Sequence, residues 1–153
     1  MKYSSLLSGL AGSLALTILH ETLRKNVDLA PRMDLMGEEG LTKVLSSIGI
    51  PIPSEPQLFN LTMGGDIIGN AGYYSLVATT PKQPIVAGTV LGMAAGVGAL
   101  TLPDKLGLNK EYSNASRKTQ LLTVAIYLFG GIVAGVVYKA LDKKSSHLKK
   151  SGK

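Results

Sequence analysis

The chain has 153 residues, of which 45% are hydrophobic and 17% are charged, and its formal net charge is +6. Its mean hydropathy is positive, at +0.23, despite this charge. The two can be combined only if charged and apolar residues are segregated along the chain. The absence of cysteine excludes a disulfide framework, a thiolate metal site and a cysteine nucleophile. The basic residues flank apolar stretches and are not interleaved with aromatic residues, so we expect no nucleic-acid partner.

Four apolar windows are long enough to cross a bilayer, whose hydrocarbon core of about 30 Å requires about 20 apolar residues in a helix. They run over about residues 3–23, 58–79, 85–102 and 119–141. The sequence therefore predicts an all-α, polytopic membrane protein. We expect residues 1–141 to form one bundle of four transmembrane helices, followed by a basic tail at residues 142–153.

The first window has a second interpretation. Lys2, a short apolar run and the small residues Ser13 and Ala15 resemble a cleavable secretory signal peptide. Cleavage would leave three spans. The apolar run continues to Leu19, beyond any cleavage site at these small residues, which favours a retained transmembrane helix.

A long polar loop, residues 24–57, joins the first two windows. Within it, Asp34 can cap a short helix, and Glu38 and Glu39 would lie near the positive end of the helix dipole. This helix is too short and too polar to span the bilayer. We expect it to lie at the membrane interface or to fold over the bundle. Arg32 completes an outer-loop polar cluster with these three acidic residues.

A metal site is a second interpretation of these acidic residues. Glu38 and Glu39 could combine with His20 and Glu21 to offer oxygen and nitrogen ligands to a divalent ion. The spacing matches no metal motif, including the two-histidine helical zinc motif, so we expect no metal. The glycines follow no predicted strand, so the sequence also predicts no nucleotide-binding loop and no cofactor.

The C-terminal tail indicates the orientation. Its lysines predict a cytoplasmic tail under the positive-inside rule, and an even number of spans then places the N-terminus on the same side. We therefore expect an integral protein of the bacterial inner (cytoplasmic) membrane, with both termini cytoplasmic. Anionic lipid headgroups should attract the tail by about 1 kcal/mol per nearby lysine. The lysines near this end are Lys139, Lys143, Lys144, Lys149, Lys150 and Lys153.

Glycines recur at four-residue spacing, which is typical of close helix contacts in lipid. The contacts could lie within one bundle. Alternatively, the strip in the third window could mediate self-association into a homo-oligomer. The glycines are Gly65 and Gly69 in the second window, Gly88, Gly92 and Gly96 in the third, and Gly131 and Gly135 in the fourth.

Asp66 is the most informative single residue, because it lies near the middle of the second window. A carboxylate at mid-bilayer costs roughly 2.5 to 3.5 kcal/mol on insertion scales. Thr62 and Asn70 lie one helical turn on either side of it, which places a polar line on one helix face. Asp66 could be a hydrogen-bonded contact between helices, or it could handle an ion, a proton or a ligand.

A second polar group lies at the outer end of the first window, where His20 and Glu21 are followed by Arg24. Long side chains on adjacent helices, or a water molecule, could connect His20 with Asp66. An interfacial histidine also occurs commonly without such a role.

Three functions remain open. A non-catalytic membrane module that binds a partner protein requires least of the sequence, and we favour it. The alternative is a small transporter or channel subunit that uses Asp66 with His20 and Glu21. A membrane-embedded enzyme acting on a lipid would use His20 as the acid–base group, oriented by Glu21 or Asp66. No catalytic motif supports the enzyme, so we expect the chain not to be one.

Overall fold

The computed structural model describes residues 2–151, and the regular secondary structure of this part of the chain consists of helices, without strands. The all-α prediction is therefore confirmed. In chain order the helices are α1 (Lys2–Asn26), α2 (Met33–Ser47), α3 (Glu55–Tyr74), the 3-10 helix η1 (Ser75–Thr79), α4 (Pro84–Thr101), the 3-10 helix η2 (Asp104–Leu106), α5 (Glu111–Asn114) and α6 (Arg117–Ser151).

Three of these helices are long and apolar enough to cross a membrane: Tyr3–Asn26 in α1, Pro84–Thr101 in α4 and Arg117–Lys143 in α6. The second predicted window forms α3, which is not among the three. Its 20 residues include Gln57, Asn60, Asp66 and Asn70, and these lower its hydropathy. The predicted count of four spans is therefore not confirmed by length and composition.

The outer faces of the apolar helices consist of large hydrophobic side chains. Along α4, Val86, Val90, Met93 and Val97 are 43–61% exposed. A corresponding row on α1 comprises Leu7, Leu10, Leu14 and Ile18. Rows of exposed apolar side chains on helices of this length suit hydrocarbon and not water. The chain is therefore a small multi-pass helical membrane protein.

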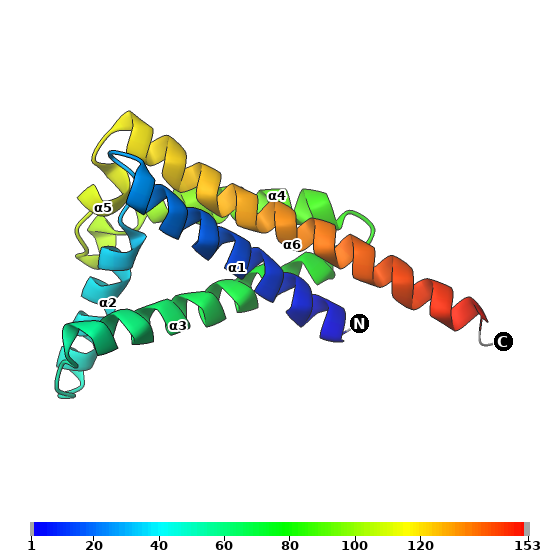
Figure 1. Cartoon of the computed structure of the whole chain (residues 1–153), viewed down its shortest axis with the longest axis horizontal. Helices are drawn as coiled ribbons and strands as arrows, with labels where there is room; N and C mark the ends of the chain where they lie inside the picture. The colour runs from blue at the N-terminus through cyan, green and yellow to red at the C-terminus, as the bar shows by residue number, and fades with distance from the viewer. Residues whose placement is uncertain (1, 152–153) are drawn as a thin grey trace.

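Helix directions alternate along the bundle (Figure 1). Gly88 of α4 lies against Gly131 of α6, and Gly96 lies against Val124, so α4 and α6 are antiparallel. Gly12 of α1 lies against Gly130 of α6. At the opposite end of this pair, Thr119 Oγ1 donates a hydrogen bond of 2.8 Å to Leu29 O. Helices α1 and α4 therefore run parallel to each other, and both are antiparallel to α6.

The contact between α4 and α6 is a direct contact of their backbones. A Cβ atom added to Gly92 would lie 2.6 Å from Tyr127 O, and one added to Gly96 would lie 2.8 Å from Val124 Cα. Gly88 meets the carbonyl oxygen of Gly131, and Gly135 would place a Cβ atom 2.5 Å from Pro84 O. In this structure α6 covers the glycines of α4 for which self-association was the alternative prediction.

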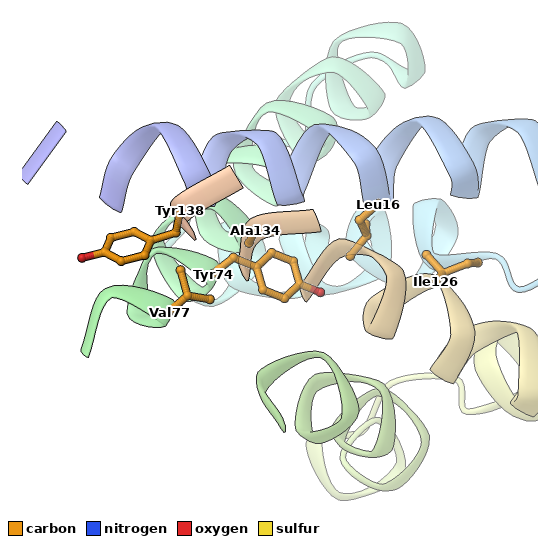
Figure 2. Packing of buried hydrophobic residues seen from close by; sticks show 6 residues of the cluster. All are labelled: Leu16, Tyr74, Val77, Ile126, Ala134 and Tyr138. Atoms are coloured by element: carbon orange, nitrogen blue, oxygen red, sulfur yellow. The ribbon is translucent and has the colours of Figure 1, made fainter. Parts of the chain in front are cut away.

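The small buried core lies where α1, α3, η1 and α6 meet (Figure 2). Tyr74 is fully buried, and its hydroxyl donates a 2.7 Å hydrogen bond to Tyr127 O of α6. Gly12 and Gly130 leave the space that its ring occupies. The side chains drawn are Leu16, Tyr74, Val77, Ile126, Ala134 and Tyr138.

One prediction about the connecting segments needs correction. The short loop helix exists as α2, but it begins at Met33 with Arg32 as its N-cap, and Asp34 makes no side-chain capping bond. Asp34 lies inside the first turn and pairs with Arg32 instead. Residues 142–151 of the predicted basic tail continue helix α6.

Candidate functional site: a polar cavity between α1, α2 and α3

Helices α1 and α3 form a tight seam at one end of the molecule. Ser5 Oγ donates a 2.9 Å hydrogen bond to Ser75 O, and Ser13 Oγ donates a 2.8 Å bond to Ile67 O. Between them, Gly9 meets the backbone of Ala71 without room for a Cβ atom. The small residues of α1 thus allow the two backbones to touch along this seam.

The two helices diverge beyond Ser13, and α2 lies across the open end (Figure 1). A cavity of about 30 Å³ occupies the space between the three helices. Its polar lining comes from Thr17, His20, Asp34, Thr62 and Asp66. Its apolar lining comes from Met33, Phe59 and Met63, with Gly37 of α2 at the wall.

Asp66 reaches this cavity from α3. Its side chain also borders a shallow groove on the outer face of α3, so it is open to the surroundings of the chain. Asn70 Nδ2, one turn further on, donates a 3.0 Å hydrogen bond to Asp66 Oδ1. Within residues 2–151, Asp66 forms no ion pair. The cavity therefore has a carboxylate without a positively charged partner.

Two threonine hydroxyl groups complete the polar wall. The Oγ1 atoms of Thr17 on α1 and Thr62 on α3 are buried, and neither has a hydrogen-bond partner in the described part of the chain. Thr62 and Asp66 lie one turn apart on the same helix, so α3 presents both to one cavity.

His20 is buried, with 5% of its surface exposed. Its Nε2 atom donates a 3.0 Å hydrogen bond to Pro31 O in the connection to α2. The other ring nitrogen, Nδ1, lies 3.7 Å from Glu21 Oε1. The imidazole is thus held by the Nε2 hydrogen bond while the ring borders the cavity.

Glu21 and Arg24 form a separate pair beside the cavity. Arg24 Nε and Nη2 donate hydrogen bonds of 2.6 and 2.7 Å to the two carboxylate oxygens of Glu21. The guanidinium also lies over the ring of Phe59, 5.8 Å from its centroid. Of the group predicted at this end of α1, only His20 lines the cavity.

Asp34 joins α2 to the two arginines. Its Oδ2 atom lies 2.7 Å from Arg32 Nη2 and 3.8 Å from Arg24 Nη1. Burial acts to raise the pKa of Asp34, but the hydrogen bonds and charge of Arg32 outweigh it and hold the pKa below its ordinary value. Asp34 therefore stays ionised, and its charge is compensated by these arginines.

The rest of the predicted outer-loop cluster does not converge on the cavity. Glu39 pairs with Lys43 at 2.8 Å and accepts a 2.9 Å hydrogen bond from the backbone nitrogen of Asn109. These contacts tie α2 to the segment before α5. Glu38 is half-buried on α2. No three histidine or acidic side chains among the described residues are grouped as a metal site.

The predicted packing glycines fall into two groups. Those of α4 and α6 lie in the contact between these helices, whereas Gly65 and Gly69 of α3 have no atom within 4 Å of an added Cβ atom. Sequence reasoning did not identify Gly37, whose added Cβ atom would lie 2.5 Å from Thr62 Cγ2. This contact arises where α2 crosses α3, and no pattern in the local sequence predicts that crossing.

Comparison with known proteins gives a partial similarity. The chain is 31% identical over 105 residues to a protein described as a probable ethanolamine permease EutH from Listeria monocytogenes serotype 1/2a (strain 10403S). The aligned region covers 62% of this chain and 28% of that protein, so the chain spans less than a third of the length of this relative. No protein-family model matches the chain, and no solved structure gives a significant match.

Proposed function

We propose that the chain is a small membrane transport protein, and that Asp66 is the counter-charge for a small cationic solute at the cavity between α1, α2 and α3. The observation that carries this proposal is a carboxylate without an ion-pair partner, on a helix of membrane-spanning length, beside a polar cavity. An intramembrane carboxylate in this setting marks a pathway for an ion or a substrate. The similarity to a probable ethanolamine permease supports transport over catalysis.

Ethanolamine is the first solute to test, since its ammonium group would complement Asp66. The purified chain would be reconstituted into liposomes, and uptake of radiolabelled ethanolamine would be compared with that of protein-free liposomes. We expect saturable uptake. Uptake no faster than in protein-free liposomes, from a preparation shown to be folded, would contradict this choice of solute.

The transport proposal includes four membrane crossings. Helices α1 and α4 run in the same direction, so if both cross, the chain between them must return through the bilayer. Helix α3 has 20 residues, about 30 Å at 1.5 Å per residue, and it runs antiparallel to α1. We propose that α3 makes this return crossing despite its polar residues, with both termini in the cytoplasm.

Single cysteines test this topology, because the chain has no cysteine of its own. Residue 28 follows α1, residue 82 precedes α4 and residue 110 follows α4. We expect Asp28→Cys and Lys110→Cys to react with a membrane-impermeant maleimide from one side, and Lys82→Cys from the other. If α3 did not cross, Lys82→Cys would react on the same side as Asp28→Cys, and the four-crossing proposal would be wrong.

A partner-binding membrane module is the second candidate function. It is favoured by a face of α3 that has glycines and no neighbouring helix against them. Gly64, Gly65, Gly69 and Gly72 all lack any atom within 4 Å of an added Cβ atom. Small residues at such spacing let another helix approach closely in lipid. A membrane-protein partner or a second copy of the chain would cover this face, and also the outward side of Asp66.

We expect Gly69→Leu to weaken this association without unfolding the chain, because the leucine would extend into open space in the monomer. The measurement is the apparent mass in mild detergent by size-exclusion chromatography with light scattering. Gly98→Leu in α4 is the matched control, since its nearest neighbour is the flexible tip of Leu102 at 3.6 Å from an added Cβ atom. A wild-type chain that is monomeric and carries no partner would argue against this candidate.

A further inference from the structure

Two threonine hydroxyl groups at the cavity lack the hydrogen bond that other threonines of the bundle make. A threonine in a helix commonly donates to the carbonyl one turn earlier. Thr22, Thr89 and Thr101 do so at 2.7 to 2.9 Å, whereas Thr17 and Thr62 have no partner among the described residues. A buried hydroxyl that is left without a hydrogen bond keeps an uncompensated desolvation penalty. The cavity thus offers two oxygen atoms that a bound group could satisfy.

The charge around the cavity is balanced except at one residue. Asp34 is compensated by Arg32 and Arg24, but Asp66 has only the amide of Asn70. One uncompensated carboxylate matches one positive charge. His20 borders the same cavity and donates from Nε2 to Pro31 O.

The size of the cavity limits what can occupy it. Its volume is about 30 Å³, and a water molecule needs at least about 10–15 Å³ measured in this way. One or two water-sized particles therefore fit. Calcium and magnesium require about six or more oxygen ligands, and the described residues contain no group of three acidic or histidine side chains that could supply them. A monovalent occupant is consistent with the single uncompensated charge.

We propose that the cavity binds one water-sized monovalent cationic group, with Thr17 Oγ1, Thr62 Oγ1 and the Asp66 carboxylate as its ligands. The group is either a free alkali or ammonium ion, or the primary ammonium end of an amine whose remainder lies outside the cavity. A trimethylammonium group is excluded, because it is too large and has no N–H to donate. This inference rests on the proposed transport function and adds the selectivity of the site.

The test is the thermal unfolding of the purified chain in detergent. A ligand that binds only the folded state raises the midpoint temperature of unfolding. The chlorides of sodium, potassium, ammonium, ethanolamine and choline would be compared at equal ionic strength. We expect at least one small cation or ethanolamine to raise the midpoint by several degrees above that in choline. The pattern across the salts separates free ions from the ammonium end of an amine.

Three threonine variants locate the ligands. Thr17→Val and Thr62→Val remove the hydroxyl with little change of shape, and we expect at least about tenfold weaker binding in each. Thr22→Val, on the outer face of α1, is the matched control and should bind like the wild type. Should either valine variant unfold, Thr17→Ser and Thr62→Ser, which keep the hydroxyl, should retain binding while Thr17→Ala and Thr62→Ala lose it.

Two outcomes would overturn the inference. The first is equal stabilisation by choline and by every smaller cation, since ionic strength alone would then explain the effect and water would suffice to fill the cavity. The second is binding that persists unchanged in both valine variants. Ethanolamine uptake without selective binding would leave the proposed function intact, whereas selective binding without ethanolamine uptake would contradict ethanolamine as the solute and keep the site.

Discussion

Replacing Asp66 by asparagine should reduce the initial rate of solute uptake by at least about tenfold. Asparagine keeps the size of the side chain and removes its charge. The loss of a charge-assisted contact is worth about 1.5–3 kcal/mol, and each 1.4 kcal/mol is a factor of about ten. The measurement is uptake of labelled ethanolamine by liposomes that contain equal amounts of folded protein.

Asp28→Asn is the control for this prediction, because Asp28 is an exposed carboxylate in the connection between α1 and α2 and does not line the cavity. It should leave uptake unchanged. The Asp66→Asn chain should remain folded, since an uncharged side chain inserts into hydrocarbon more readily than a carboxylate. Uptake at the wild-type rate in Asp66→Asn would remove this residue from the mechanism.

Replacing Gly92 by leucine should prevent the bundle from folding. The atoms nearest to an added Cβ atom are Tyr127 O at 2.6 Å and Leu128 Cα at 2.7 Å. Both belong to the backbone of α6 and cannot rotate away, so α4 would have to separate from α6. Even Gly92→Ala should lower the free energy of unfolding by about 1–3 kcal/mol. Unfolding of purified protein by sodium dodecyl sulfate, followed by circular dichroism, measures the effect.

Gly98→Ala provides the comparison within the same helix. Its added Cβ atom would lie 3.6 Å from Leu102 Cδ1, an ordinary contact. Because alanine restricts the unfolded chain more than glycine does, the free energy of unfolding should stay constant or rise by up to about 1 kcal/mol. If Gly92→Ala proved as stable as Gly98→Ala, the close contact of α4 with α6 would not describe the protein in detergent.

The apolar helices could be predicted from the sequence because hydropathy over about 20 residues depends on composition alone. The window that contains Asp66 was also predicted to span the membrane, but the polar residues of α3 lower its hydropathy, and it is not among the helices apolar enough to cross. That α3 crosses is part of the proposed function and rests on the directions of α1 and α4. The prediction that Asp34 caps α2 was wrong for a local reason. The Asp34 carboxylate accepts hydrogen bonds from the Arg32 side chain instead of making a capping bond to the helix backbone.

The site was partly accessible from the sequence. The spacing of Thr62, Asp66 and Asn70 on one helix face follows from helical periodicity, and the structure places the first two at the cavity. The absence of Glu21 from the cavity lining could not be foreseen, because it depends on the two hydrogen bonds by which Arg24 holds the Glu21 carboxylate. The contributions of Met33 and Gly37 depend on where α2 crosses, which the loop sequence does not specify.

Under the proposed function, the seam between α1 and α3 would limit the direction in which the cavity releases its occupant. Beyond the cavity, toward the chain termini, the hydrogen bonds from Ser5 and Ser13 and the backbone contact at Gly9 hold the two helices together. On the opposite side, α2 and its arginine–aspartate contacts lie over the cavity. Under the proposed function, an ion held at Asp66 would exchange past α2 or along the groove on the outer face of α3. Delivery to the compartment nearer the chain termini would require the two serine bonds to break.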